Sequence, residues 1–282
     1  MSAAAAPESP AVTVVEPPKG WAWPDWRELW SHRDLLWVLA RRDVAVLYKQ
    51  SLIGAAWAII QPVLLAAVFS LFFGRLAHIG TGSDVPYPVF ALLGMVTWLF
   101  FAVAIGKVAS STVVSAPLIS KVYFPRLVIP AAAVSAPLID FVVGFVVALV
   151  VLLLYGVIPP VQVVLSPLLV PLLLAVTLGF GLWLAALHVK YRDIGPLVSF
   201  GVLLGLFITP VVYPLSNVPD AYHLLYSLNP MVGVLELMRW MTLPGSEFPV
   251  VPLSVTLVES SVLLATGILY YGRAEREFAD VV

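Results

Sequence analysis

Asp140 and Glu259 are two acidic residues that stand well inside long apolar stretches of the chain. Carboxylates in such surroundings usually face the interior of a helix bundle or an aqueous path, so this pair could relay protons across a membrane. No lysine, arginine or histidine lies near either residue in the sequence. Because proton-coupled transport usually needs a denser series of ionisable groups, a proton-coupled secondary transporter is kept only as an alternative.

Sequence motifs for catalysis and metal binding are missing from the chain. It contains no His-Glu-x-x-His pair, no Gly-x-Ser-x-Gly turn and no Gly-x-x-x-x-Gly-Lys phosphate loop. It also has no cysteine, which excludes disulfides and thiolate-bound metals. We therefore expect that the chain is no enzyme by itself and holds neither a metal nor a cofactor.

The composition indicates a membrane protein. Hydrophobic residues make up 61% of the chain and charged residues 11%, and the mean hydropathy is +1.00. A water-soluble surface cannot accommodate such a composition. The formal net charge of −1 and the dispersed basic residues argue against a nucleic-acid partner.

Six apolar stretches are long enough to cross the hydrocarbon layer, which takes about 20 helical residues. They predict an all-α membrane protein with six transmembrane helices. The predicted spans cover residues 48–73, 85–108, 127–155, 163–188, 194–213 and 250–271. Gln61-Pro62 lies within the first span, and we expect a bend there because proline removes a backbone donor and crowds the preceding turn.

The positive residues predict the orientation. With an inward N-terminus, every lysine and arginine except Arg75 and Arg239 falls on the cytoplasmic side. The positive-inside rule therefore places both termini in the cytoplasm.

The regions flanking the spans differ in composition. Residues 1–20 are rich in proline and alanine without periodicity and predict a disordered tail. Residues 21–50 alternate tryptophan and leucine with arginine, which predicts an amphipathic interfacial helix, either a membrane anchor or a platform for a partner protein. The six-helix domain is expected over 51–273, and a cytoplasmic tail over 274–282.

Two predicted cytoplasmic connections carry charge. The connection 109–130 is interrupted by prolines, and we expect a short helix over 118–124 that presents Lys121 and Tyr123 to a soluble partner. Alternatively its cations only mark the inner interface. The connection 188–196 is short and charge-dense. Its candidate partner-binding residues are Lys190, Arg192 and Asp193.

The predicted outer connection over residues 209–245 contains five prolines yet is moderately apolar. It is too interrupted for a continuous span and too hydrophobic for a solvated loop. Two re-entrant half-helices that break near Leu228-Asn229-Pro230 would satisfy both observations and could gate a pathway. An amphipathic segment lying flat on the outer surface is the alternative.

Four ordered motifs resemble a known family. They are ARRDVAVLYKQSLIGAAWAIIQPVLLAAVFSLFFGRL, LISKVYFPRLVIP, VKYRDIGP and LNPM. In order and spacing, residues from about 34 to 271 resemble the permease subunit of type-2 ABC exporters that handle O-antigen, teichoic acid and related glycans. The resemblance implies a homodimer in the bacterial plasma membrane, with two copies of a separate nucleotide-binding subunit that uses ATP and Mg.

The resemblance also implies docking and gating residues. The amphipathic segment and the loop after the second span would dock on the ATPase, and the break in the outer hairpin would form the gate. The docking residues implied are Arg41, Arg42, Tyr48, Lys49, Lys121, Tyr123, Phe124 and Arg126, and the gate residues are Leu228, Asn229 and Pro230.

The implied substrate is a glycan on a polyprenyl diphosphate. Its anionic head would be attracted by Arg41, Arg42 and Lys49. Its sugars would stack on aromatic rings along the path. The candidate lining is Trp57, Gln61, Phe69, Phe72, Phe73, Trp98, Phe100 and Phe101. These aromatic residues could instead face lipid or the core, and a permease for lipids or drugs is a further alternative.

Overall fold

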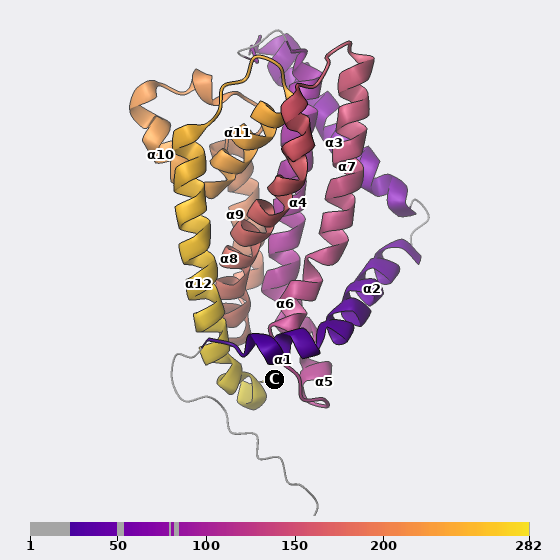
Figure 1. The fold of residues 1–282 in the computed structure, drawn as a ribbon, viewed down its shortest axis with the longest axis vertical. Coiled ribbons are helices and arrows are strands. Elements are labelled where there is room, and N and C mark those ends of the chain that lie inside the picture. The colour runs from indigo at the N-terminus through magenta and orange to yellow at the C-terminus, as the bar shows by residue number, and fades with distance from the viewer. Residues whose placement is uncertain (1–22, 50–53, 79, 82–84, 282) are drawn as a thin grey trace, which may run out of the picture.

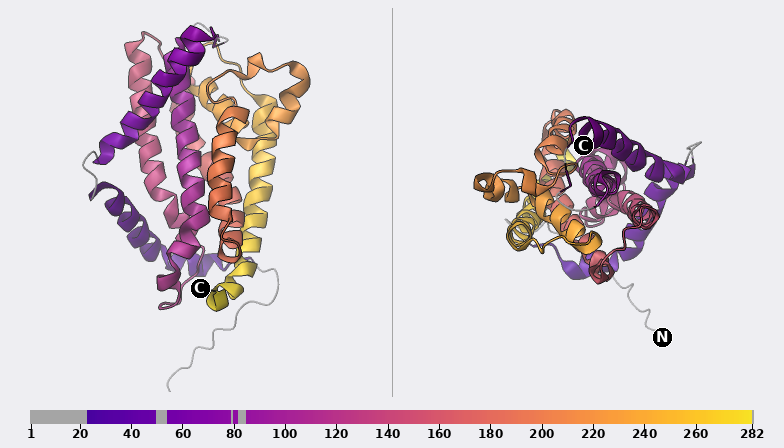
Figure 2. Two further views of the ribbon diagram at one scale, coloured as in Figure 1. Left: turned by 180° about the vertical axis from the view of Figure 1, so that it is seen from behind. Right: turned by 90° about the horizontal axis from the view of Figure 1, so that it is seen from above.

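The computed structural model describes residues 23–49, 54–78, 80–81 and 85–281, and every regular element in these ranges is helical. The predicted tail over residues 1–20 lies outside the described ranges. Long helices stand side by side in one bundle (Figures 1 and 2). They are α3 (Trp57–Phe69), α4 (Tyr87–Val114), α7 (Ser135–Leu154), α8 (Leu169–Lys190), α9 (Ile194–Ile208) and α12 (Val250–Val281).

Shorter elements lie at the ends of this bundle. The α-helices are α1 (Trp26–Ser31), α2 (Arg33–Lys49), α5 (Ala116–Ile119), α6 (Val128–Ala133), α10 (His223–Ser227) and α11 (Pro230–Thr242). The 3-10 turns are η1 (Gly54–Ala56), η3 (Val161–Leu168), η4 (Leu215–Asn217) and η5 (Asp220–Tyr222), and η2 (Ser70–Leu76) is a π-helix.

The two ends of the bundle carry different elements. One end, called the cationic end here, carries α1, α5 and the C-terminal turns of α12 (Figure 1). The opposite end carries α10 and α11 and is called the hairpin end (Figure 1). The right-hand view of Figure 2 looks along the bundle.

Helix α4 forms the centre of the bundle. In its most hydrophobic 18-residue stretch, 78% of the residues are buried. The helix contacts α3, α6, α7, α8, α9 and α11. A helix that is apolar on every side is expected in such a position. Small residues let its neighbours approach closely: a Cβ atom on Gly181 of α8 would lie 2.4 Å from Cγ1 of Val108.

Among the residues that the structure describes, five helical stretches are long and apolar enough to cross a membrane, which confirms a multi-pass helical protein. They are Trp57–Leu76, Tyr87–Val114, Val128–Leu154, Val161–Lys190 and Val250–Glu275. The fifth predicted span, over 194–213, is represented by α9, which has 15 residues. At 1.5 Å per residue it extends about 22 Å, less than the ~30 Å hydrocarbon layer. A sixth span therefore stays a prediction.

The first span begins at Trp57, whereas hydropathy placed its start at residue 48. Helix α2 continues through Lys49, and Gly54 has a left-handed φ of 52° that separates it from α3. Tyr48 and Lys49 therefore belong to the amphipathic helix. Helix α3 continues through Pro62, and the irregularity lies further along, where η2 winds as a π-helix.

Two predicted connections also differ from the structure. The short helix expected over 118–124 is α5, which ends at Ile119, because Pro117 favours a helix start and Pro125 disfavours helix in the residue before it. The last helix does not end at residue 271. Helix α12 continues through the expected tail to Val281.

The hairpin end contains the predicted break. Helices α10 and α11 are separated at Leu228 and Asn229, and Pro230 is the first residue of α11. The two helices are unequal, because α10 has 5 residues and α11 has 13. The prediction of two helices is confirmed, and the structure adds that the second is the larger and the more buried.

Candidate functional site

The amphipathic N-terminal helices and the loop after α5 pack together at the cationic end. Their shared core is an apolar cluster formed by Leu39, Phe124, Val128, Ile129 and Ala132, which we call the platform cluster. Side chains of α1, α2 and α5 pack against it. Two segments that the sequence assigned separately to partner docking therefore form one surface.

Within the loop, neighbouring aromatic residues have opposite environments. Phe124 is 4% exposed inside the platform cluster, whereas Tyr123 is 67% exposed. Lys121 is also exposed. The prediction that Phe124 offers a docking surface is corrected by this burial: its ring holds the loop on α2, while Lys121 and Tyr123 face outward.

Arg126 is committed to a contact within the chain. Its Nε lies 3.5 Å from Oε1 of Glu275, and its Nη1 donates to the Glu275 carbonyl oxygen. Tyr271 shares a hydrogen bond of 2.9 Å with Thr112. These contacts attach the loop and α4 to α12, so Arg126 holds the loop in position within the chain.

The end of α12 also influences Tyr123. Partial burial and the neighbouring carboxylates of Glu28 and Glu275 raise the pKa of Tyr123 above its usual range. Its hydroxyl therefore stays protonated near pH 7 and remains a hydrogen-bond donor, with Glu28 as a neighbouring acceptor.

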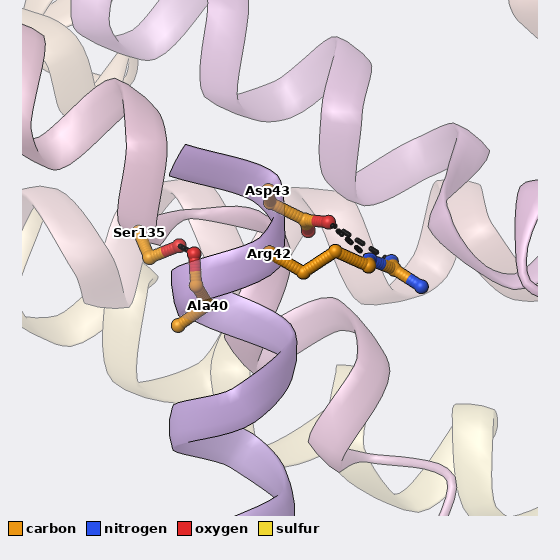
Figure 3. Close-up of polar contacts among 4 residues, drawn as sticks. All are labelled: Ala40, Arg42, Asp43 and Ser135. Atoms are coloured by element: carbon orange, nitrogen blue, oxygen red, sulfur yellow. Dashed lines mark hydrogen bonds and ion pairs between the residues drawn. The ribbon is translucent and has the colours of Figure 1, made fainter. Parts of the chain in front are cut away.

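Two of the predicted cations of α2, Arg41 and Arg42, are exposed. Arg42 pairs with Asp43 at 2.9 Å (Figure 3). Ser135 Oγ donates to the Ala40 carbonyl at 3.5 Å and attaches α2 to the start of α7 (Figure 3). Lys49 ends α2, and its side chain lies outside the described part of the structure.

The link between α8 and α9 presents its three predicted charges outward. Lys190, Arg192 and Asp193 are all exposed. His188 Nδ1 lies 3.1 Å from the Ala109 carbonyl oxygen and donates to it when the proton is on Nδ1. This His188 contact attaches the end of α8 to α4.

The predicted glycan-lining residues fall into separate environments within one chain. Trp57 and Gln61 line a cavity of about 140 Å³ between α3, α4 and α7, together with Phe100. Trp98 and Phe101 line another cavity, of about 300 Å³, between α4, α8 and α9. The structure of one chain therefore does not bring the candidates together on a single surface.

The remaining lining candidates lie near the hairpin end of α3. The rings of Phe69 and Phe73 stack at 5.7 Å and pack against the main core, whereas Phe72 is 55% exposed. Trp98 and Phe101 are 4% and 9% exposed, which makes them core residues of this chain. Trp57, the first residue of α3, is likewise exposed, at 51%.

The two intramembrane carboxylates do not meet. Asp140 lines the cavity that also contains Trp57 and Gln61, and the residues around that cavity come from η1, α3, α4 and α7. Glu259 lies on α12, and its Oε2 is buried without a hydrogen-bond partner among the described residues. A direct relay between them therefore has no support in the structure.

The predicted gate residues belong to a bonded joint. The Asn229 side chain accepts from the Met231 amide at 3.1 Å and so caps α11, and its Nδ2 donates to Thr209 Oγ1 at 2.7 Å. Pro230 is buried, and its carbonyl accepts from Thr256 of α12 at 3.1 Å. Leu228 is 55% exposed at the tip of the break.

Arg239 is a buried charge whose role the sequence did not reveal. It is 3% exposed and donates to Glu236 at 2.6 Å. It also donates to the Pro210 and Val211 carbonyl oxygens at 2.6 and 3.0 Å. Its guanidinium carbon lies 4.1 Å from the centre of the Phe90 ring. The spacing of Glu236 and Arg239 was the available signal, because residues three apart share a helix face.

In the ranges that the structure describes, no group of three or more histidine or acidic side chains is arranged to hold a metal ion.

Long apolar helices, with an amphipathic platform at one end and a broken helical hairpin at the other, define an integral membrane protein. Residues 34–243 match the sequence model of the ABC-2 type transporter family. The chain belongs to this family.

Similar proteins cover nearly the whole chain. An O-antigen export system permease protein, RfbA, of Myxococcus xanthus is 33% identical over 91% of this chain and 98% of its own length. The protein of the same name in Klebsiella pneumoniae is 26% identical over 88% of this chain and 95% of its own length. The polysialic acid transport protein KpsM of Escherichia coli is 23% identical, with coverages of 83% and 91%.

Proposed function

We propose that the chain is the permease subunit of an ATP-driven exporter that moves a polyprenyl-diphosphate-linked polysaccharide out of the cytoplasm. Membership of the ABC-2 type transporter family supports the transport class. The names of the relatives, O-antigen export permease and polysialic acid transport protein, support a polysaccharide substrate. The single observation that carries the proposal is the similarity to an O-antigen export permease over 98% of that protein's length.

The assembly in this proposal is a homodimer with two copies of a separate nucleotide-binding subunit, which uses ATP and Mg. The platform cluster supports a docking role for the cationic end, because it presents Lys121 and Tyr123 on a rigid base. The exposed Lys190, Arg192 and Asp193 offer a second charged contact. In a bacterial inner membrane, this end would face the cytoplasm, with both termini.

The proposed transport step is a tilting of packed helices. ATP-driven closure of the partner would push on the platform, and α4 would carry the displacement because it contacts both α6 and α11. Since the lining candidates are dispersed within one chain, the path would form between two copies. Trp57 of α3 and Phe72 of η2 would contribute to it, because both side chains are exposed.

The test is export in cells from which this chain has been deleted. Restoring the chain should return a polyprenyl-linked glycan to the cell surface, and an ATPase subunit should co-purify with it. An active-site variant of that ATPase should abolish export while leaving insertion of the permease unchanged. Surface glycan that is unaffected by the deletion, or a lipid or drug as the only exported compound, would refute the proposal.

A further inference from the structure

A groove lies between α2, α4 and α6 at the cationic end of the bundle, with a volume of about 440 Å³. One wall comes from the face of α2 that carries Arg42 and Asp43, and the other comes from α4 and α6. Aliphatic side chains make up much of its surface, including Leu39, Val46 and Ile129. The groove is therefore apolar at its sides and charged at a few defined positions.

Lys107 is the unusual residue of this groove. It is half-buried seven residues before the end of α4, about 10 Å along the helix axis from that end. Its ammonium group has neither an ion-pair partner nor a hydrogen-bond acceptor among the residues that the structure describes. A cation at such depth is costly unless an anion or water stabilises it.

The other polar groups leave this positive charge uncompensated. Asp43 Oδ1 accepts from Nε and Nη2 of Arg42, so these two side chains neutralise each other (Figure 3). The remaining terminal nitrogen of Arg42 lies outside that pair (Figure 3). Ser110 and Ser111 donate to carbonyl oxygens of α4 itself, at 2.9 and 2.7 Å. The groove therefore has a net charge of +1, centred on Lys107.

We propose that this groove binds the phosphate head group of an amphiphilic lipid, with Lys107 as the principal cation and Arg42 as the second donor. Phosphate oxygens form strong charge-assisted hydrogen bonds with both groups, and the aliphatic walls accept the first part of the hydrocarbon chain. Resting on the proposed function, we assign the diphosphate of the polyprenyl carrier as the occupant. Arg41 is exposed on α2 and is not among the lining residues.

The experiment measures binding to the full-length chain in complex with its ATPase, in detergent. The probes are farnesyl diphosphate, phosphatidylglycerol and inorganic diphosphate, and the readout is a dissociation constant from native mass spectrometry. Lys107→Gln should weaken farnesyl diphosphate binding about tenfold or more, whereas Lys107→Arg should stay within about threefold of the wild type. Arg75→Gln removes an exposed cation at the other end of the bundle and should change nothing.

Asp43→Asn distinguishes a binding role from a structural one. It frees Arg42 from its ion pair and removes a negative charge from the groove, so farnesyl diphosphate should bind more tightly. A variant that only loosened the packing of α2 would weaken binding instead. Both Asp43→Asn and Lys107→Arg keep the groove polar, so they test the site even where Lys107→Gln fails to insert.

Three outcomes would overturn the inference. Equal affinity of the wild type and an intact Lys107→Gln variant would remove Lys107 from the site. Tighter, Lys107-dependent binding of phosphatidylglycerol than of farnesyl diphosphate would overturn the carrier as occupant. Equal binding of inorganic diphosphate would overturn the role of the aliphatic walls. Failure of the wild-type chain to restore glycan export would instead refute the proposed function, so the two failures are distinguishable.

Discussion

The two ends of the bundle stabilise their charged residues in opposite ways. At the hairpin end, Arg239 is 3% exposed, and its hydrogen bonds join α11 to the segment that follows α9. At the cationic end, cohesion comes from the apolar platform cluster around Phe124, and Lys121 remains exposed. The hairpin end thus buries one charge and compensates it with groups of the same chain, whereas the cationic end presents Lys121 on an apolar base.

This difference assigns a different physical task to each end. A buried ion pair with additional carbonyl acceptors fixes the positions of the segments that it joins, because removing one partner would leave an uncompensated charge. An apolar cluster instead holds helices and loops together without directional bonds. The exposed charged groups around it can therefore bind and release a partner. We therefore expect substitutions at the hairpin end to affect folding, and substitutions at the cationic end to affect coupling.

The largest expected effect is that of Arg239→Met. It removes the partner of Glu236 and leaves the Pro210 and Val211 carbonyl oxygens without their donor. The loss should be about 3–5 kcal/mol of stability, measured as a lower midpoint of thermal unfolding in detergent. Arg75→Gln, an exposed arginine near the same end, is the matched control and should stay within about 0.5 kcal/mol.

The double variant sharpens this comparison. Replacing Glu236 by glutamine together with Arg239→Met removes both charges, so part of the lost stability should return. If Arg239→Met unfolds at the wild-type temperature, the hairpin end does not depend on its buried charge, and the contrast between the two ends fails.

At the cationic end, the corresponding substitution is Phe124→Ala. Removing the ring from the platform cluster should cost about 3 kcal/mol, near the lower limit for such a change, because the cluster is small and can collapse. The expected result is local: proteolysis should cleave the loop between α5 and α6 faster, while the rest of the bundle resists as before. Tyr123→Ala is the control, since its exposed ring leaves the cluster intact.

A smaller effect is expected at the joint before α11. Asn229→Ala removes both the cap of α11 and the hydrogen bond to Thr209, and should cost about 1–2 kcal/mol in thermal unfolding. Asn229→Asp keeps the capping oxygen and loses only the donor to Thr209, so it should cost less. Equal losses for the two variants would mean that the cap contributes nothing.

The sequence predicted the features that follow from lipid as a solvent. Long apolar runs must be helical there, so five spans could be found from hydropathy. The prolines around residue 230 predicted the break between α10 and α11. The start of the first span was misplaced, because hydropathy carries no signal for the left-handed backbone at Gly54.

Burial of individual side chains was harder to predict. Phe124 and Tyr123 are adjacent aromatic residues in an irregular loop, where no periodicity distinguishes the inward ring from the outward one. Arg239 is compensated partly by carbonyl groups 28 and 29 residues earlier in the chain. Such long-range contacts leave no local pattern in the sequence, so they can be recognised only when the fold is known. The dispersal of the lining candidates has the same cause.

The smallest expected effect on stability is that of Lys121→Glu, which should also uncouple transport. Lys121 is exposed and outside the platform cluster, so the reversal should change unfolding by less than about 0.5 kcal/mol. Stimulation of the partner ATPase and glycan export should nevertheless both fall, because the substitution reverses a charge at the proposed interface.

Arg126→Glu is a poorer test, since it also breaks the pair with Glu275. A compensating charge reversal on the ATPase should restore export for Lys121→Glu and not for Arg126→Glu. Normal export by Lys121→Glu would remove this surface from the coupling path and leave the cationic end with a structural role only.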